Sequence, residues 1–366
     1  MQLIIEREKL IKPLQQISNL LNGRPIQPIL GNILIEVNNK LLSLTVTDLE
    51  IDMVTHILLL KSDKQGSTTV PARKFLAICR NLPKESIINI FSKDNHIFIN
   101  SGNSRFSLLT LPSTNFPNID NWHIEIEFNL IQGSLKQLIA FTQFSMAYQD
   151  IRYYLNGIMF ETSSEGIRAV ATDGHRLATC FIKTHNKLPN YSVIVPRKGI
   201  TELMRLLNGE NTNLKIQIGS NNIRVYTNEI IFTSRLINAS FPDYHQVLQK
   251  HLDKSLEVDC ILLKQALSRA AILSNEQFMG IRLNISKNQL IIKANNPDNE
   301  ESEEKLKVIY NSDKLEICLN VIYILDILNI LKNGVVRLSF KDSMSSVRIQ
   351  NIANENICYV IMPMRM

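Results

Sequence analysis

The stretch VPARKFLAICRNL, residues 70–82, returns farther along the chain as VPRKGITELMRLL, residues 195–207, at an offset of 125. Both stretches are typical of amphipathic helices, because apolar side chains recur every three or four residues. Pro71 and Pro196 suit the first turn of a helix, where the missing N–H is not needed. A helix repeated at a fixed offset indicates that a larger unit of the chain is duplicated.

Four other landmarks recur in the same order and at nearly the same spacing. They are Thr47-Asp48 with Thr172-Asp173, Phe116-Pro117 with Phe241-Pro242, the glycines Gly31, Gly157 and Gly280, and the lysines Lys12, Lys136 and Lys264. Chance matches of single dipeptides would not keep one order and one offset. We therefore predict one domain present three times, at residues 1–121, 129–243 and 245–366.

Short runs rich in β-branched residues lie between the helices, as at residues 230–237, 288–295 and 335–340. Such runs, bounded by turn residues, are typical of strands. Two amphipathic helices per copy combined with these strands predict an α+β fold in which the sheets are antiparallel. Pro13 predicts that the helix near the N-terminus is kinked or begins late.

The composition indicates an ordinary globular protein, expected in the cytoplasm. The 366 residues are 45% hydrophobic and 20% charged, and the apolar runs are far shorter than the ~20 residues needed to cross a bilayer. Charged residues at positions 6–9 stand where a signal peptide would need its apolar core. Five scattered cysteines indicate reduced thiols, with neither disulfide bonds nor a zinc site. The net charge of +6 permits a polyanionic partner without requiring one.

The stretch ATDGHRL, residues 171–177, could be an acid/base pair of an enzyme, since Asp173 and His175 lie two residues apart. Its counterpart in the first copy is TDLE, residues 47–50, and in the third copy roughly residues 295–298. A threonine-aspartate pair after a strand favours a turn, because both side chains hydrogen-bond nearby backbone. No nucleophile, second carboxylate, metal-ligand spacing or phosphate-binding loop accompanies the histidine. We predict no catalytic residues, no metal and no cofactor; a hydrolase built on this stretch is the alternative.

Basic residues keep their places on the duplicated helices. Arg73 and Arg80 lie on one helix face, and the equivalent places in the second copy hold Lys198 and Arg205. The three lysines named above likewise share one position on the other helix of each copy. A polar helix face is often basic for solvation alone, but charges kept in register favour a sequence-independent contact with a phosphate backbone. The third copy departs from this pattern, because its second helix carries a single basic residue, Lys332.

Many short phrases along the chain resemble one family. They are GRPIQPILGN (23–32), LTVTDLE (44–50), VPARKF (70–75), SRFSL (104–108), NFPN (115–118), QDIRYYLNG (149–157), ATDGHRL (171–177), VIVPRKG (193–199), QIGSNNIR (217–224), FPDY (241–244), AILSNE (271–276) and MPMR (362–365). In this order and over the whole length, the chain is similar to the bacterial DNA polymerase III β subunit family, the sliding clamps. The resemblance implies three domains of the DNA-clamp type, each with two helices and antiparallel sheets. Two subunits are then expected to join head to tail into a ring with the helices lining the hole.

The resemblance implies a non-catalytic processivity factor of DNA polymerase that encircles double-stranded DNA and slides, because it reads no base. An external ATPase would have to open the ring, since this chain has no phosphate-binding loop. The expected DNA contacts are Arg24, Arg73, Gln149, Tyr153, Tyr154, Lys198 and Arg205. For Tyr153 and Tyr154 the alternative is a place half in the core. The rival to the whole interpretation is a monomeric repeat adaptor that binds proteins without encircling DNA.

The resemblance also implies a surface pocket that receives short linear peptides. The expected partners are the replicative polymerase α subunit, the clamp-loader δ subunit and other proteins with a clamp-binding motif. No contact with a membrane is expected. The matching positions are Arg152, Leu155, Thr172, Gly174, His175, Arg176, Leu177, Pro242, Val247, Ser346, Val360, Met362, Pro363, Met364 and Arg365. Their leucines, valines and methionines would form an adaptable apolar socket. Gln246 stands where many relatives have arginine, so a different peptide affinity is expected.

The head-to-tail contact is expected to use one set of residues on each side. One set is Lys74, Arg105, Phe106 and Leu108, and the other is Ile272, Leu273, Glu300, Glu301, Glu303 and Glu304. Taken alone, the acidic segment DNEESEEK would also fit a solvated loop. His96, Asn100 and Asn103 stand where relatives often carry arginines, so the ionic part of this contact is expected to be weaker.

Overall fold

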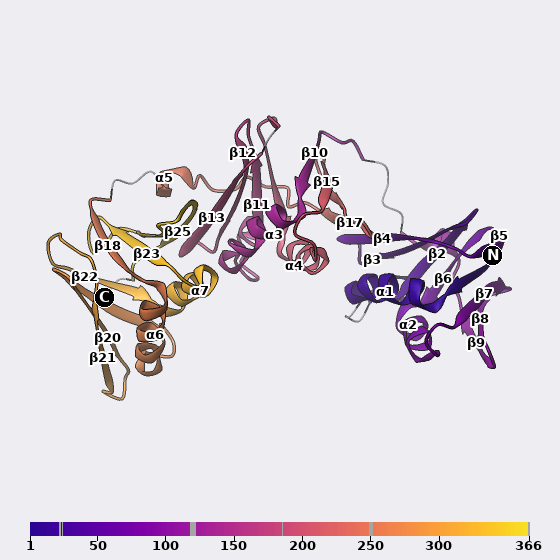
Figure 1. Ribbon diagram of the computed structural model, residues 1–366, viewed down its shortest axis with the longest axis horizontal. Coiled ribbons are helices and arrows are strands. Elements are labelled where there is room, and N and C mark those ends of the chain that lie inside the picture. The colour runs from indigo at the N-terminus through magenta and orange to yellow at the C-terminus, as the bar shows by residue number, and fades with distance from the viewer. Residues whose placement is uncertain (22, 24, 118–121, 185, 249–251, 365–366) are drawn as a thin grey trace. The chain divides into compact units, whose positions relative to one another are not determined.

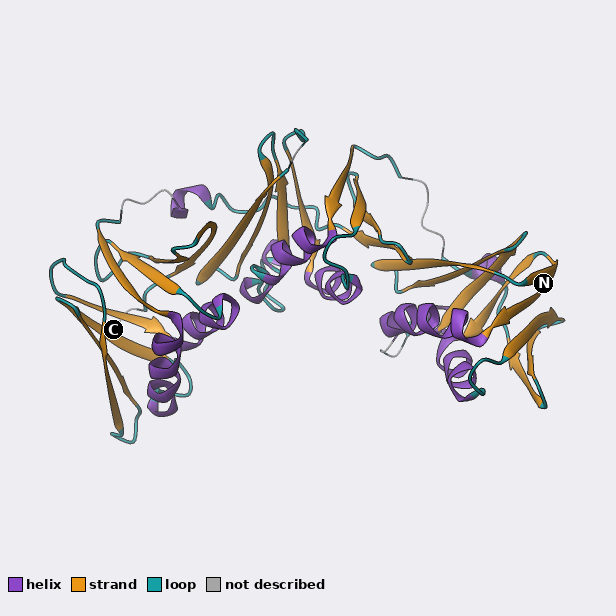
Figure 2. Ribbon diagram, in the orientation of Figure 1, coloured by secondary structure: helices purple, strands orange, loops and turns teal. Residues whose placement is uncertain are grey.

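A computed structural model describes residues 1–21, 23, 25–117, 122–184, 186–248 and 252–364 (Figure 1). The chain divides into two compact units, Met1–Gly133 with Thr201–Leu236, and Ser134–Ile200 with Ile237–Met366. Each unit is built from antiparallel sheets and short helices (Figure 2). The predicted α+β class with antiparallel sheets is confirmed.

The first unit holds a five-stranded and an eight-stranded sheet. The smaller has the order β5-β1-β7-β8-β9, with β1 at Gln2–Glu6, β5 at Lys61–Lys64, β7 at Ile87–Lys93, β8 at His96–Ser101 and β9 at Ser104–Leu109. The larger has the order β10-β15-β16-β17-β4-β3-β2-β6, with β2 at Asn32–Asn38, β3 at Leu41–Thr47, β4 at Ile51–Leu58, β6 at Gly66–Pro71, β10 at Ile126–Ile131, β15 at Asn213–Ile218, β16 at Asn222–Tyr226 and β17 at Ile230–Arg235.

The second unit holds an eight-stranded and a four-stranded sheet. The larger has the order β14-β11-β12-β13-β25-β24-β23-β18, with β11 at Gly157–Thr162, β12 at Gly166–Thr172, β13 at Arg176–Lys183, β14 at Tyr191–Pro196, β18 at Lys254–Asp259, β23 at Val335–Phe340, β24 at Val347–Asn351 and β25 at Asn354–Ile361. The smaller has the order β21-β20-β19-β22, with β19 at Gly280–Ser286, β20 at Gln289–Asn295, β21 at Glu301–Lys307 and β22 at Leu315–Asn320.

The helices bury one apolar face each. In the first unit α1 (Arg7–Ser18) packs against α2 (Ala72–Asn81), and α1 buries Leu10, Leu14 and Ile17, which follow the helical spacing of three to four residues. In the second unit α6 (Cys260–Ala270) packs against α7 (Val321–Leu331) in the same way. α3 (Gln132–Ala140) and α4 (Arg197–Leu206) contain residues of both units, and α5 (His245–Leu248) is a single turn.

The positions of three prolines relative to the helices differ in part from the prediction. α1 begins at Arg7 and runs through Pro13, so the predicted late start of this helix is wrong. Pro71 and Pro196 each end a strand, and α2 and α4 begin at the next residue. Each proline therefore lies just before the first turn, where its missing N–H still costs no helical hydrogen bond. No helix in the described part of the chain is long and apolar enough to span a membrane.

The predicted copies meet within the two large sheets. β4 pairs with β17 in the first unit, and β13 pairs with β25 in the second, both antiparallel. At the repeat spacing β4 is equivalent to β13, and β17 is equivalent to β25. The strands at the same places in the third and first copies are β21 and β9. Each of these is the end strand of its sheet.

Candidate functional site

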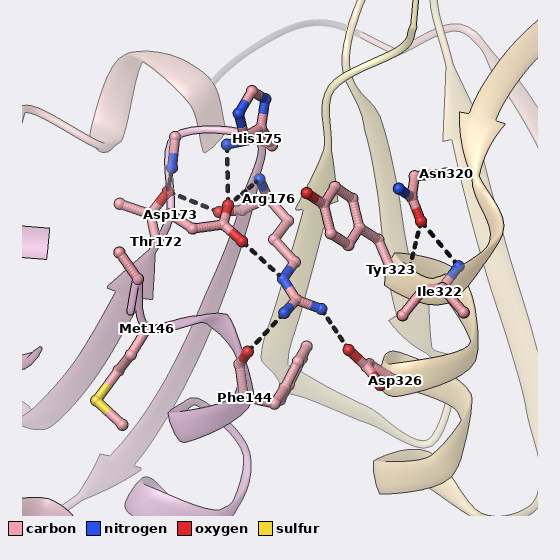
Figure 3. Close-up of polar contacts among 12 residues, drawn as sticks. Phe144, Met146, Thr172, Asp173, His175, Arg176, Asn320, Ile322, Tyr323 and Asp326 are labelled. Atoms are coloured by element: carbon pink, nitrogen blue, oxygen red, sulfur yellow. Dashed lines mark hydrogen bonds and ion pairs between the residues drawn. The ribbon is translucent and has the colours of Figure 1, made fainter. Parts of the chain in front are cut away.

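The turn from Thr172 to Arg176 joins β12 to β13 and is held by its own side chains (Figure 3). The Thr172 Oγ1 accepts a hydrogen bond from the Gly174 N–H at 3.0 Å. The Asp173 Oδ1 accepts from the N–H groups of His175 and Arg176 at 2.9 and 3.0 Å. Asp173 is therefore a turn-forming residue, as its sequence context predicts.

Arg176 connects this turn to two other parts of the unit (Figure 3). Its Nε donates to the Asp173 Oδ2 at 3.0 Å, its Nη2 to the Phe144 carbonyl at 2.8 Å, and its Nη1 to the Asp326 Oδ2 on α7 at 2.5 Å. The guanidinium carbon also lies 4.5 Å from the Tyr323 ring centre. The His175 side chain points away from this cluster (Figure 3).

A cavity of about 220 Å³ opens beside the turn. Eleven of the predicted pocket residues line it, namely Arg152, Leu155, Thr172, Gly174, His175, Arg176, Leu177, Pro242, Val247, Val360 and Met362. They come from η5 (Tyr153–Leu155) and the residue before it, the turn and the start of β13, α5 and the segment leading into it, and the end of β25 with the residue after it. The family resemblance therefore grouped residues that are up to 210 positions apart, from Arg152 to Met362.

The cavity wall is apolar and its rim is charged. Leu155, Leu177 and Val360 are each less than 10% exposed, and they belong to the packed interior of the unit. At the rim, Arg152 donates from Nε and Nη2 to the two carboxylate oxygens of Asp150 at 3.0 and 2.8 Å. These hydrogen bonds lower the pKa of Asp150 to about 2. The site can accept an apolar side chain while keeping polar groups at its mouth.

Four further residues line the cavity: Tyr154, Phe241, Asp243 and Tyr244. Three of them belong to the phrase FPDY, which is among the phrases that carry the family resemblance, and its Phe241-Pro242 repeats Phe116-Pro117. Tyr244 donates its hydroxyl hydrogen to the Glu161 Oε2 at 2.6 Å, and burial together with this bond raises the pKa of Tyr244. Tyr154 lies in the wall, in keeping with the alternative placement half in the core.

Three other predicted pocket positions, Ser346, Pro363 and Met364, are not among the residues that line the cavity. Ser346 is buried, and the Met364 N–H donates to the Cys318 carbonyl at 2.9 Å, which places Met364 beside β22. Pro363 lies between Met362 and Met364 and is half-buried. Arg365 falls outside the described residues. Gln246 donates from Nε2 to the Asp243 Oδ2 at 3.0 Å, so its amide is engaged with a rim carboxylate.

The expected DNA contacts are spread over several elements. Gln149 and Lys198 are exposed, and Tyr153 is 56% exposed. Arg73 on α2 donates from Nη2 to the Gly23 carbonyl at 2.9 Å, and Arg205 on α4 forms an ion pair with Glu202 at 2.5 Å. Arg24 falls outside the described residues.

The three equivalent lysines have unequal surroundings. Lys12 on α1 forms an ion pair with Glu229, in the loop before β17. Lys136 on α3 and Lys264 on α6 are half-buried. An ion pair offsets part of the positive charge at Lys12, so the register of these lysines by itself does not define one continuous basic surface.

Six of the ten residues of the expected head-to-tail contact lie on the end strands of the small sheets. Arg105, Phe106 and Leu108 belong to β9, and Lys74 is exposed on α2. On the other side Ile272 is 77% exposed in η6 (Ala271–Leu273), which also contains Leu273. Glu301, Glu303 and Glu304 belong to β21, directly after Glu300. The acidic segment is thus mainly an edge strand, and the alternative of a solvated loop is wrong for residues 301–304.

Two of these glutamates already have basic partners within the chain. Glu303 pairs with Lys293 at 2.8 Å and Lys305 at 2.9 Å, and these bonds lower the pKa of Glu303 to about 2. Glu304 receives two hydrogen bonds from Arg269 at 2.8 Å. His96 and Asn103 are exposed and Asn100 is half-buried, on or next to β8. Among the described residues there is no cluster of three metal-ligating side chains.

Comparison with known proteins agrees over the whole chain. Family models of the DNA polymerase III beta subunit match its N-terminal domain at residues 1–120, its central domain at 129–243 and its C-terminal domain at 245–365. The beta sliding clamp of Escherichia coli K12 is 55% identical and that of Vibrio cholerae 47% identical, each over 100% of both chains. The crystal structure of the DNA polymerase III subunit beta from Pseudomonas aeruginosa is 43% identical and superimposes with a TM-score of 0.97, covering 100% of both chains. The chain therefore belongs to the DNA polymerase III beta subunit family, the bacterial beta sliding clamps.

Proposed function

We propose that two copies of this chain join head to tail into a closed ring around double-stranded DNA, and that the cavity beside Thr172–Arg176 tethers partner proteins by short peptides. As a sliding clamp of DNA polymerase III, the chain is a processivity factor in DNA replication and not itself an enzyme. The finer points proposed are the ring, the residues that touch DNA and the occupant of the cavity.

The observation that carries the ring is the equivalence of four pairing strands. Inside the chain, a strand of the β4 and β13 type twice pairs with a strand of the β17 and β25 type. The remaining members of the two types, β21 and β9, are end strands with backbone groups available along one side. An unpaired edge favours association. Pairing β21 of one subunit with β9 of the next would repeat the internal junction, and such a heterologous contact closes when the rotation permits.

Charge and shape at the two edges support this pairing. β21 contributes carboxylates from Glu301 and Glu303, whereas β9 contributes Arg105 and the partly exposed ring of Phe106. Because Glu303 already pairs with Lys293 and Lys305, its attraction for a partner is reduced. We therefore expect apolar contacts such as Phe106 and Ile272 to contribute more than ion pairs to holding the ring.

The ring is tested by mass and by DNA topology. Sedimentation of the purified protein is expected to give about twice the 41.8 kDa of one chain. After loading by a clamp-loader ATPase, the protein should stay on sealed circular DNA and leave once the circle is cut. Phe106→Asp should yield single chains and lose retention, whereas Met344→Asp, at a residue 66% exposed between β23 and β24, should behave as wild type. A wild-type mass of one chain with equal retention on cut and sealed DNA would favour the monomeric adaptor.

The cavity suits a peptide that presents apolar side chains. Its lining is mostly aliphatic and aromatic, and its wall residues Leu155, Leu177 and Val360 are held in the interior and need no ordering when a ligand enters. A QLxLF-like peptide offers leucine and phenylalanine side chains for this wall. His175 at the rim then lies near the polar groups of the peptide, whereas the Arg152 guanidinium already bonds Asp150 and the Asp173 carbonyl.

Titration of a fluorescent QLxLF-like peptide tests the cavity. Leu177→Ala, His175→Ala and a chain truncated at Met362 are each expected to lose binding, because they remove the wall, the rim and the end of the last segment. Met344→Asp is the matched control and should bind as wild type. Unchanged affinity in all three altered proteins would reject the peptide site.

Contact with DNA is proposed to be diffuse and independent of sequence. Arg73 on α2 matches Lys198 on α4, and Arg80 matches Arg205. Contacts of such residues with phosphates release counterions and weaken steeply with salt. A closed ring would not need strong contacts to stay on DNA. Replacing Lys198 and Arg205 by alanine should therefore weaken binding to linear DNA at low salt while leaving retention on sealed circles.

A further inference from the structure

We propose that Asp326 on α7 is a positioning residue for the peptide cavity, acting through Arg176 on the turn that forms one wall. Asp326 is 150 residues from Arg176 in the chain and is not among the residues that line the cavity. This inference rests on the peptide-binding role proposed above, and it assigns a part of α7 to that role.

The turn depends on contacts beyond its own hydrogen bonds for its position. Three links tie it to its surroundings: the Met362 N–H donates to the His175 carbonyl at 2.8 Å, the Arg152 Nη2 donates to the Asp173 carbonyl at 3.3 Å, and the Arg176 side chain reaches Phe144 and Asp326. The first two links involve residues of the cavity lining itself. Only the third, among these, connects the wall to a helix outside the cavity.

The Arg176 guanidinium is largely shielded from water, so its N–H groups depend on acceptors within the protein. The Arg176 side chain is 12% exposed, and the side chains of Asp173 and Asp326 are 18% and 34% exposed. Each of its three bonding nitrogens has one acceptor, and the Tyr323 ring covers its face (Figure 3). If the Asp326 carboxylate were removed, Nη1 would lose its acceptor in a water-poor place, and the guanidinium would shift to regain one.

A shift of Arg176 would also move the cavity wall, because Arg176 is joined directly to the wall residue Leu177 in the chain. The backbone of Arg176 is fixed to Asp173 Oδ1, and its Nε to the other oxygen of the same carboxylate. Leu177, the next residue, is an apolar wall residue of the cavity. The cavity would therefore change shape at the wall where a peptide side chain is expected to pack.

α7 itself is a rigid support for Asp326. The helix begins with Asn320, whose Oδ1 accepts from the N–H groups of Ile322 and Tyr323 at 2.9 and 3.4 Å (Figure 3). Its buried face of apolar residues, including Ile324 and Ile327, packs into the interior on either side of Asp326 in the sequence. A carboxylate on such a helix keeps its place, whereas one on a loop would follow the turn.

The test is a double-mutant cycle read by peptide affinity. Asp326→Ala is expected to weaken binding of a fluorescent QLxLF-like peptide about three- to tenfold. In an Arg176→Ala background the same change should have no further effect, because the link is already broken. Asp326→Asn keeps a carbonyl oxygen that can accept from Nη1, so it should retain most of the affinity. Asn329→Ala, an exposed change one turn along α7, is the matched control and should bind as wild type.

The outcomes separate this inference from the peptide site itself. If wild type binds no peptide, or if Leu177→Ala binds as tightly as wild type, the peptide site is wrong. If wild type binds, Leu177→Ala does not, and Asp326→Ala binds with unchanged affinity, the positioning role alone is wrong. Equal weakening by Asp326→Ala with and without Arg176 would also overturn it. Should Asp326→Ala unfold near the assay temperature, all the affinities are measured below its unfolding transition, so that the same comparison is made on folded protein.

Discussion

Two turns of this chain, Thr47–Ile51 and Thr172–Arg176, have the same hydrogen bonds from backbone N–H groups to threonine and aspartate side chains. They differ in the side chains that follow the aspartate. In the first, Thr47 Oγ1 accepts from the Leu49 N–H at 3.0 Å, and Asp48 Oδ1 accepts from the N–H groups of Glu50 and Ile51 at 3.0 and 2.8 Å. These bonds match those of Thr172 and Asp173 one for one. The threonine and aspartate therefore build a scaffold, and the residues after them decide its use.

The residues that follow the scaffold differ sharply in chemistry. Ile51 is buried where the second turn has Arg176, and Asp52 is buried where the second turn has the cavity residue Leu177. The helix position equivalent to Asp326 is Glu202, whose carboxylate pairs with Arg205 on its own helix. Ile51 carries no charge, so the bond from Arg176 to a helix carboxylate has no counterpart at this position of the first turn. The two copies share the turn, and in the second copy Leu177 provides the wall and Arg176 its support.

Replacing Leu177 by the aspartate found at the equivalent position of the first turn should have the largest effect on stability. Leu177→Asp places the carboxylate of the first turn in the apolar wall of the second. We expect the free energy of unfolding to fall by about 3 kcal/mol, because packing is lost and a charge is buried. Denaturant titration measures this loss, and peptide binding should disappear with it. The control Leu58→Asp, at a residue 72% exposed on β4, should change stability by less than about 0.5 kcal/mol.

Removing the turn-forming carboxylates should cost somewhat less. Asp48→Ala and Asp173→Ala each leave two backbone N–H groups without their acceptor, at about 2 kcal/mol per turn. Asp173→Ala should cost more than Asp48→Ala, because it also frees the Arg176 Nε. Parallel denaturant titrations of the two proteins measure the difference. Equal losses would mean that the Arg176 contact adds nothing to the stability of the second turn.

Asp52 should make the first turn sensitive to pH. Burial raises its pKa from 3.8 to about 6, against the opposing effect of a hydrogen bond from Thr47. Between about pH 4 and pH 6 the folded state then holds a proton that the unfolded state releases, so stability falls as the pH rises through this window. Asp52→Asn should remove that slope and be more stable than wild type by roughly 2 kcal/mol at pH 8, with little difference at pH 4.

Unfolding at pH 4, 6 and 8 measures this effect. Asp150→Asn is the control, because the pKa of Asp150 is lowered to about 2 and so lies below the window. Its loss of stability should be the same at all three pH values. A slope in Asp52→Asn as steep as in wild type would assign the pH dependence to other groups.

The smallest effects are expected at the third position of each turn. Leu49 has a φ of 76° and Gly174 a φ of 89°, in the left-handed region that favours glycine. Gly174→Ala should cost about 1 kcal/mol, and its Cβ would lie 3.0 Å from the Arg152 guanidinium. Leu49→Gly should be neutral or slightly stabilising, since relief of strain offsets the added freedom of the unfolded chain. Thermal unfolding of both proteins checks the opposite signs.

The sequence predicted well the features that depend on residues close together in the chain, such as turns and helices. The side-chain bonds of Asp173 reach only two and three residues ahead, so a threonine-aspartate pair in the sequence was enough to predict the turn. The apolar spacing in α2 and α4 likewise predicted helices, and only the position of their prolines differed by one residue. The cavity lining was reached in another way, through resemblance to a family, since its members come from four distant segments.

By itself, then, the sequence determined the repeated unit, the α+β class, the turns and the family, because periodicity and short-range hydrogen bonds are written in consecutive residues. Only the tertiary structure decided that Arg176 meets Asp326 150 positions away, that Lys12 meets Glu229, and that Tyr154 joins the cavity wall. These contacts arise where separately formed sheets and helices pack, and a charged side chain takes whichever opposite charge that packing brings within reach.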